Sequence, residues 1–363
     1  MSLLTKLKSN TSKALKEFAS TLDEASIFLE KELIPTPVPA LNIALSGQLD
    51  GGLGPGHTML AGPSKHFKSG FMLLMVKSFL DKYPDGVCLF YNNEFGTPLS
   101  YFESFGIDMS RVWHVPFMDV EQLKMDLMGQ LNGIVNGDKV IVAIDSIGNA
   151  ASKKEVEDAL EGKSVADMTR AKQFKSMFRM ITPYLTLKNI PLVTINHTYK
   201  TIEMYSKDVV GGGTGSYYSA DNIFIIGRQQ EKDGTELAGY NFIINIEKSR
   251  YVKEKSKIPI EITYGEGISK WSGLLTLASE GGFVNKVRKR SYVYNRIDPV
   301  TGEVEDKDFL EEETRTKAFW TPILDNPKFK EYIKERYAVS HGSIITDEDA
   351  VEDVYDSIPE DEE

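Results

Sequence analysis

Between about residues 40 and 285, short β-rich runs alternate with longer helical patterns, and this alternation leaves few folds open. Parallel strands read as short apolar runs, and each needs a crossover, usually helical, before the next. We therefore expect an α/β fold with a twisted, mainly parallel sheet, helices on both faces, and ligands at the carboxyl ends of the strands. An Asp-Gly turn signal at 233–234 predicts a hairpin at one end of the sheet. The predicted strands are 58–61, 87–91, 112–115, 140–144, 191–196, 222–226 and 242–247, and the predicted helices are 71–80, 99–105, 120–135 and 171–187.

The two ends of the chain differ from this core in composition. Leucines and lysines at helical spacing over residues 1–20 predict an amphipathic helix, and three prolines within residues 35–39 mark a stiff boundary after it. After residue 285 the sequence becomes basic and aromatic, and then acidic. The predicted units are an N-terminal helical and oligomerisation arm (1–34), the core (35–285), a small C-terminal domain (286–345) and an acidic disordered tail (346–363).

The net charge of -11 comes almost entirely from the tail, which holds ten acidic residues and no basic one. The other 345 residues carry 42 basic and 43 acidic side chains, so the overall charge does not exclude a polyanionic partner. No apolar run approaches the roughly 18 residues of a membrane span, and the single cysteine, Cys88, cannot form an intrachain disulfide. With no secretion signal in the sequence, we expect a cytoplasmic protein without a membrane partner.

The strongest local motif is a candidate phosphate-binding loop between the strand at 58–61 and the following helix. Backbone N–H groups of such a loop, together with the positive end of the helix dipole, surround a polyphosphate. Lys68 is expected to reach the terminal phosphate oxygens and Ser69 to ligate Mg²⁺. Phe67 stands where the GxxxxGK(S/T) pattern has a glycine, a residue that tolerates a left-handed backbone or close phosphate approach. The loop consists of Gly62, Pro63, Ser64, Lys65, His66, Phe67, Lys68 and Ser69.

Two acidic residues follow predicted strands, as nucleotide hydrolysis requires. Asp145 ends the apolar run that begins at Val140 and is expected to hold Mg²⁺ through water. Glu94 follows the run at 87–91 and suits the polarisation of an attacking water, although a helix cap or a surface ion pair is an equally compatible role.

Together with segments 39–47, 51–56, 194–197, 211–214 and 264–268, these motifs occur in the order seen in RecA-type recombinases, which the chain resembles. The resemblance implies a RecA-like ATPase core with ATP and Mg²⁺ as cofactors. It implies that Tyr101 stacks on adenine and that His197 senses the γ-phosphate. It also implies that Lys248 and Arg250 reach across a subunit interface to the phosphates of a neighbouring chain. A solvated basic strand edge is the alternative for this pair.

Two long polar segments, 152–169 and 198–215, are predicted to be loops, and the resemblance implies that they contact DNA. A basic and aromatic stretch at 286–296 is a further candidate for duplex DNA, or a solvated hairpin. Within the two loops and the helix between them, the resemblance implies phosphate contacts by Arg170, Lys172 and Lys175, backbone contacts by Gly211, Gly212, Gly213 and Thr214, and base stacking by Tyr199, Met204 and Tyr205.

The expected function is ATP-dependent homologous recombination by a helical homo-filament on single-stranded DNA, which pairs with double-stranded DNA and exchanges strands. The resemblance implies a single-strand-binding protein and a recombination mediator as partners. Two alternatives stay open at this point: a replicative hexameric helicase built on a similar core, and a regulatory ATPase of the circadian-clock type that does not bind DNA.

Overall fold

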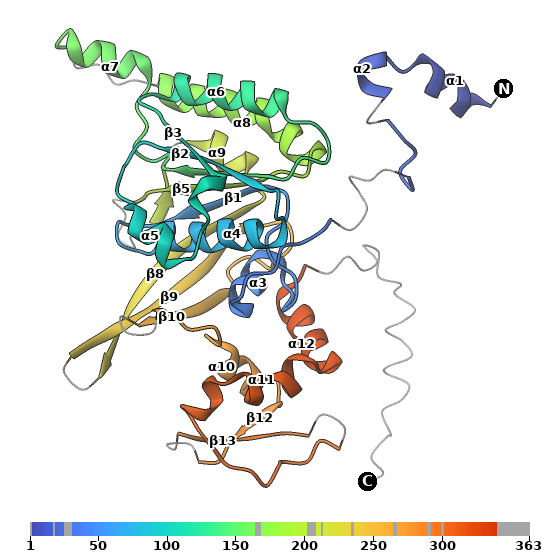
Figure 1. Ribbon diagram of the computed structural model, residues 1–363, viewed down its shortest axis with the longest axis vertical. Helices are drawn as coiled ribbons and strands as arrows, with labels where there is room; N and C mark the ends of the chain where they lie inside the picture. Colours follow the sequence, from blue (N-terminus) through green and yellow to red (C-terminus); the bar gives the residue numbers. More distant parts are fainter. Residues whose placement is uncertain are drawn as a thin grey trace, which may run out of the picture.

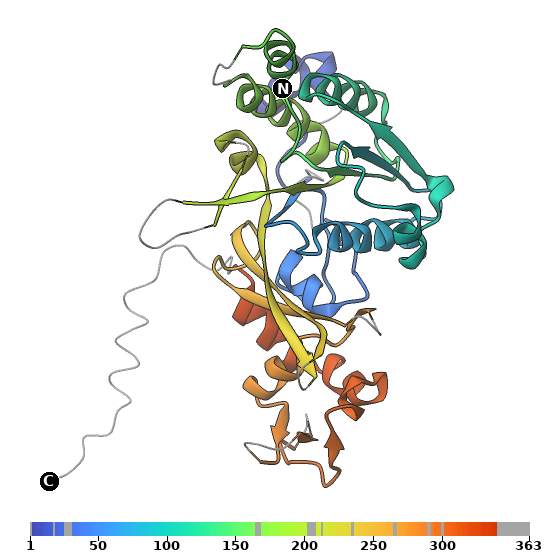
Figure 2. The same ribbon diagram turned by 90° about the vertical axis from the view of Figure 1, so that its left-hand side faces the viewer.

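The computed structural model contains a large sheet with helices on both faces and a smaller C-terminal part below it (Figures 1 and 2). This arrangement confirms the predicted fold class. The structure describes residues 2–16, 19–24, 31–163, 168–201, 208–211, 213–233, 236–263, 267–288, 292–298 and 301–339.

Nine strands form the main sheet in the order β11-β10-β9-β8-β1-β5-β4-β2-β3. The pairs from β8 through β1, β5, β4 and β2 to β3 are parallel, whereas β8, β9, β10 and β11 pair antiparallel, so the predicted hairpin is present as β8 and β9. All seven predicted strands are found. The strands are β1 Gly56–Ala61, β2 Val87–Asn92, β3 Val112–Pro116, β4 Val140–Asp145, β5 Pro191–Asn196, β8 Asn222–Asp233, β9 Glu236–Ser249, β10 Lys257–Thr263 and β11 Gly267–Ile268, and a separate ribbon pairs β6 Thr198–Lys200 with β7 Asp208–Val210.

The central parallel strands β1, β4 and β5 are buried on both faces, because two separate hydrophobic clusters cover them, whereas the edge strand β3 is partly exposed. On β1, Leu60 packs in the cluster that contains α3 and α4, and its neighbour Met59 packs in the cluster that contains α6 and α8. The four predicted helices are present as α4, α5, α6 and α8. The helices of the core are α3 Pro39–Ser46, α4 Lys68–Lys82, α5 Leu99–Ser104, η1 Met109–Arg111, α6 Val120–Gly133, α7 Lys153–Leu160, α8 Thr169–Leu187 and α9 Thr214–Ser219.

The prediction of one continuous amphipathic helix over residues 1–20 is wrong. The structure has two short helices, α1 Leu3–Asn10 and α2 Lys13–Lys16, and α1 lies apart from the body of the molecule (Figure 1). The break follows from Thr11, whose hydroxyl and backbone N–H both donate to the carbonyl of Leu7 while its own backbone turns extended. No residue of α1 is buried.

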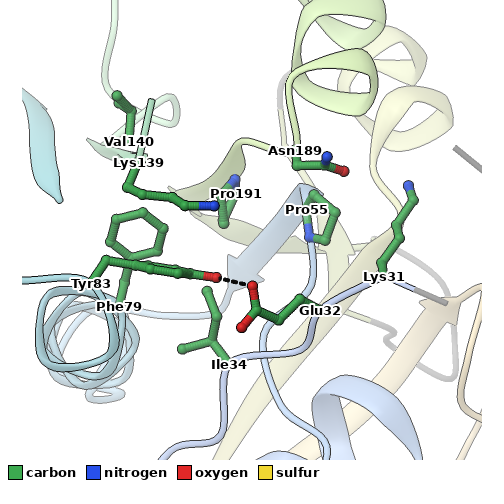
Figure 3. A pocket seen from close by; sticks show the side chains of 10 residues that line it. All are labelled: Lys31, Glu32, Ile34, Pro55, Phe79, Tyr83, Lys139, Val140, Asn189 and Pro191. Carbon is green, nitrogen blue, oxygen red and sulfur yellow. Dashed lines mark hydrogen bonds between the residues drawn. The ribbon is translucent and has the colours of Figure 1, made fainter. Parts of the chain in front are cut away.

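Residues 31–34 join the arm to the amino-terminal edge of the sheet (Figure 3). The Glu32 carboxylate accepts a hydrogen bond from Tyr83 Oη at 2.8 Å and forms an ion pair with Lys82 Nζ at 2.7 Å. Ile34 is buried and bridges to Leu53. The start of the core is therefore tied to the last turn of α4.

The C-terminal part packs around Trp271 and Trp320, whose rings stack at 6.1 Å. It returns to the core at its end, where Val339 N–H donates to the carbonyl of Tyr251 at 2.9 Å. The acidic segment 346–363 lies outside the described residues, and the proposed domain limits stay predictions. In the described part of the chain, no helix combines the length and the apolar character that crossing a bilayer requires. The elements are α10 Leu274–Glu280, β12 Val284–Lys286, β13 Val293–Arg296, β14 Phe309–Leu310, η2 Glu313–Arg315, α11 Lys317–Leu324 and α12 Pro327–Tyr337.

Candidate nucleotide and nucleic-acid site

The carboxyl ends of β1, β2, β4 and β5 meet at one edge of the sheet. Their register places Ala61 beside Asn196 and Asn92 beside Asp145. The residues that follow these strands line one cavity of about 340 Å³. Sequence reasoning placed the phosphate loop, Glu94, Asp145 and His197 in one site, and the structure brings these four features together.

The backbone of the phosphate loop explains why a phenylalanine is tolerated at position 67. Phe67 has a φ of 56°, the left-handed conformation that glycine adopts most easily. Its ring packs against Phe71, Tyr101 and Phe242, with centroid distances of 5.3 to 6.4 Å. Gly70 makes this possible, because a Cβ at that position would lie 2.3 Å from the ring. Aromatic burial therefore offsets backbone strain of order 1–3 kcal/mol.

Lys68, the first residue of α4, is buried and points back over the loop. Its Nζ donates to the carbonyls of Gly62 at 2.9 Å and Pro63 at 2.7 Å. Burial lowers the pKa of Lys68, while the charges of Glu94 and Asp145 act in the opposite direction. The ammonium is thus held at the place where a terminal phosphate would meet the loop.

Ser69 and Asp145 supply the oxygen atoms that suit Mg²⁺. Ser69 Oγ donates to Asp145 Oδ2 at 2.9 Å, and Thr97 Oγ1 lies 3.4 Å from the same oxygen. Burial raises the pKa of Asp145, and the hydrogen bond from Ser69 opposes this rise. Among the described residues no group of three or more His, Cys, Asp or Glu side chains is arranged to hold a metal. The Ser69 hydroxyl and the Asp145 carboxylate are two adjacent oxygen donors, which fit Mg²⁺ because this ion takes most of its remaining ligands from water and phosphate.

Glu94 is held by three donors that converge on one carboxylate oxygen. Its Oε1 accepts from the hydroxyl of Ser146, from Asn149 Nδ2 at 2.9 Å and from His197 Nε2 at 2.9 Å. The hydrogen bond from His197 is the largest cause that lowers the pKa of Glu94, so the carboxylate is ionised near neutral pH. Sequence reasoning missed Ser146 and Asn149 as partners. Ser146 was detectable as the neighbour of Asp145, whereas Asn149 carries no local signal.

A larger cavity of about 840 Å³ adjoins the phosphate loop on its other side. Tyr101 and Phe67 line both cavities, and Tyr240 and Phe242 add further aromatic surface to the larger one. Burial raises the pKa of Tyr101 to about 12, so its ring is neutral. Flat aromatic walls of this kind suit a purine base, and the stacking of Tyr101 on adenine stays a prediction.

Lys248 and Arg250 lie at the opposite edge of the sheet from the phosphate loop. Lys248 on β9 pairs with Ile223 on β8. The preceding residue of β8, Asn222, pairs with Thr58 near the start of β1. Lys248 Nζ donates to the carbonyls of Tyr217 and Tyr218 at the end of α9, at 2.9 and 3.1 Å. The exposed Arg250 pairs with Asp221 through a 2.7 Å contact. The structure therefore does not bring these cations to the chain's own phosphate loop.

The first predicted DNA loop is wrong over Lys153–Leu160, where the structure has helix α7. A capping box explains the helix, because Ser152 and Glu155 bond reciprocally at its first turn. This Ser-x-x-Glu spacing was visible in the sequence. On α8, Lys172 and Lys175 are exposed, but Arg170 turns inward and donates to the carbonyls of Ile147 and Gly148.

The second predicted loop includes the ribbon of β6 and β7, where the side chain of Tyr199 is 57% exposed. Gly211 N–H donates to the carbonyl of His197 at 2.9 Å, which ties the end of the ribbon to the site. Gly213 caps α9 with a φ of 79° and lies against Ala171 of α8. Met204, Tyr205 and Gly212, and the side chain of Thr214, lie outside the described residues.

In the basic stretch at 286–296, the ammonium of Lys286 lies 5.9 Å from the ring centroid of Tyr292 and 5.5 Å from that of Tyr294. Arg296 is paired with Glu305 at 2.8 Å. Arg296 is therefore bound within the C-terminal part and contributes little free charge to this stretch.

Comparison with known proteins gives the same family as the motifs. Residues 14–269 match the model of the RecA N-terminal domain, and residues 271–333 match that of the C-terminal domain of the recombination and repair protein of bacteriophage T4, UvsX. The T4 recombination and repair protein is 50% identical over 344 residues, covering 94% of this chain and 86% of the T4 protein. Protein RecA of Bacteroides thetaiotaomicron is 25% identical over 70% of this chain and 76% of its own, and that of Staphylococcus aureus 24% over 75% of each. These matches confirm the predicted resemblance, and the chain belongs to the RecA family.

Proposed function

We propose that the chain is an ATP-dependent recombination protein that assembles head to tail on single-stranded DNA and drives pairing and strand exchange with a homologous duplex. The observation that carries the proposal is the distribution of charge over two edges of one sheet. The phosphate loop and Glu94 lie at one edge, and Lys248 and Arg250 lie at the other. A head-to-tail contact whose rotation does not close brings the two edges together repeatedly and generates a helix.

In this assembly each ATP lies between two chains. Lys68 donates to the terminal phosphate oxygens, Glu94 orients and deprotonates the attacking water, and Lys248 and Arg250 of the neighbour stabilise charge on the transferred phosphoryl group. Ser69 and, through water, Asp145 would hold Mg²⁺, which would neutralise phosphate charge.

Single-stranded DNA is expected to meet the surface formed by α8 and the β6–β7 ribbon. Lys172 and Lys175 supply exposed cations, and Tyr199 supplies an exposed ring for stacking. His197 contacts Glu94 with its ring and Gly211 with its backbone carbonyl, so a change at the phosphates reaches the ribbon through one residue. Lys248 links the opposite edge to the end of α9 in a similar way.

The direct test is the rate of ATP hydrolysis with and without single-stranded DNA, combined with electron microscopy of the complex. We expect stimulation by the DNA, helical filaments in the micrographs, and no hydrolysis by the Lys68→Ala variant. Absence of both stimulation and filaments would refute the proposal.

Complementation tests the shared site more sharply. Lys248→Ala and Lys68→Ala chains are each expected to be inactive alone, but a 1:1 mixture contains complete sites wherever an intact loop meets an intact Lys248. Random assembly makes about a quarter of the sites complete. Lys257→Ala, which removes an exposed lysine nearby, is the matched control and should behave as wild type. A mixture as inactive as its components would refute the role of Lys248 across the interface.

A further inference from the structure

The turn at residues 146–149 contacts both the Glu94 carboxylate and helix α8, which follows the first segment predicted to contact DNA (152–169). We propose that Asn149 and Arg170 are positioning residues for Glu94: Asn149 holds the carboxylate directly, and Arg170 fastens the turn to α8. This inference rests on the proposed function, because it assigns how the ATPase group is held in register with the DNA-facing helix.

The first argument is the crowding on Glu94 Oε1. A carboxylate oxygen has about two lone-pair sites, yet three donors converge on this one. At least one donor is therefore replaceable without loss of the carboxylate's orientation. Ser146 and Asn149 belong to the same short turn, whereas His197 belongs to another strand and also joins the β6–β7 ribbon. The turn would thus keep Glu94 in place if the hydrogen bond from His197 were lost.

The second argument is that the turn itself is fixed at several points. Ser146 is fully buried, and its N–H donates to Asn93 Oδ1 at 2.8 Å. Ile147 N–H donates to the carbonyl of Ile195 at 2.9 Å. At Gly148 a Cβ would lie 2.4 Å from His197 Cδ2, so the turn and the His197 ring are in close contact. Asn149 is itself exposed, but it directly follows these fixed residues and its N–H donates to Ser146 Oγ at 3.4 Å, so its side chain starts from a fixed position beside Glu94.

The third argument is the direction of the Arg170 side chain. Its guanidinium donates to the carbonyls of Ile147, at 3.0 Å, and Gly148, and lies 5.8 Å from the ring centroid of Phe174. Among the described residues it has no carboxylate partner, and its Nε is buried without an acceptor. By contrast, Lys172 and Lys175 on the same helix are exposed. Arg170 therefore faces the turn rather than the surface proposed for DNA.

Asn149→Ala tests the direct contact. We expect kcat for DNA-stimulated ATP hydrolysis to fall about tenfold or more with KM for ATP unchanged, because loss of a charge-assisted hydrogen bond affects the orientation of Glu94 and not phosphate binding. Binding of Mg-ATP and the thermal unfolding midpoint report whether the fold survives, and Asn149→Asp, which places a second negative charge beside Glu94, should lower kcat at least as much. An unchanged kcat in both variants, or a change confined to KM, would overturn the proposal.

Arg170→Ala separates positioning from phosphate contact. A phosphate contact contributes about 0.7 to the slope of log affinity for single-stranded DNA against log salt concentration. We expect Arg170→Ala to lower kcat at saturating DNA with a wild-type slope, and Lys172→Ala to reduce the slope. Both carbonyls accept from one nitrogen of Arg170, Nη2, so Arg170→Lys, which keeps a charged nitrogen donor, should restore part of the kcat that Arg170→Ala loses. If Arg170→Ala reduces the slope and keeps the wild-type kcat, the positioning role of Arg170 is refuted and the proposed function is not affected. If the wild-type chain shows neither ATPase activity nor DNA binding, the proposed function is refuted as well.

Discussion

Replacing His57 by phenylalanine should make the protein more resistant to acid, because His57 is buried as a neutral ring at the base of β1. The ring stacks on Phe178 with centroids 4.8 Å apart, and Nε2 is hydrogen-bonded to Thr194 Oγ1 at 2.8 Å. Among the described residues Nδ1 finds no partner and is shielded from water. Burial first, and the charge of Lys248 second, lower the pKa of His57 from 6.5 to about 3.

The sign and size of the effect follow from proton linkage. Because the folded pKa lies below the unfolded one, the stability due to a neutral His57 is fully present above pH 6.5 and is lost as the pH falls toward 3. At pH 5 the unfolded chain has taken up the proton and the folded chain has not, which lowers the free energy of unfolding by about 2 kcal/mol. The full difference between the two pKa values corresponds to about 5 kcal/mol, reached near pH 3.

Urea unfolding followed by far-ultraviolet circular dichroism, at pH 7.5 and pH 5, measures this loss. His57→Phe keeps a stacking ring but cannot titrate, so effects of all other groups appear in both proteins and cancel. Wild type should lose about 2 kcal/mol more than the variant between the two pH values. Equal losses, or a His57 Cε1 proton resonance that titrates near pH 6.5 in the folded protein, would refute the reasoning.

Two further substitutions probe the nucleotide site. Phe67→Gly should be more stable than Phe67→Ala by about 1 kcal/mol in urea unfolding, because the backbone there has a φ of 56°; the reverse order would contradict a left-handed loop. Gly148→Ala should displace the ring of His197 from Glu94, since the new Cβ would lie 2.4 Å from His197 Cδ2. Losing that hydrogen bond raises the pKa of Glu94, so the acid limb of the hydrolysis rate moves to higher pH, and an unshifted limb would show that the ring stayed in place.

Sequence patterns predicted the sheet and the edge where the nucleotide groups meet, because apolar periodicity and strand order are local properties. Glu94 and His197 were placed at strand ends, and the parallel register then brings them into contact without further information. The direction of a long side chain is not a local property. Arg170 was grouped with Lys172 as a phosphate contact, yet its guanidinium reaches the turn at 147–148, which precedes it by more than twenty residues.

The role of Asn149 also could not be predicted from the sequence. An asparagine four residues after a strand has no characteristic spacing, and its role emerges only when the turn folds back onto Glu94. Helix α7 differs, since its capping box is visible in the sequence, although the charged residues that dominate the segment favoured a loop. A charged segment between two strands is therefore worth testing for caps before it is assigned as a loop.

Helix α4 starts at Lys68 in the phosphate loop and ends at Lys82, which forms an ion pair with Glu32. Glu32 also accepts a hydrogen bond from the next residue, Tyr83 (Figure 3). It is one unbroken rod of 15 residues, about 22 Å long. Because this helix is continuous and contacted at both ends, a displacement of its first turn would be transmitted along the rod to Tyr83 and Glu32. The phosphate loop and the first residues of the core are thus mechanically connected through a single helix.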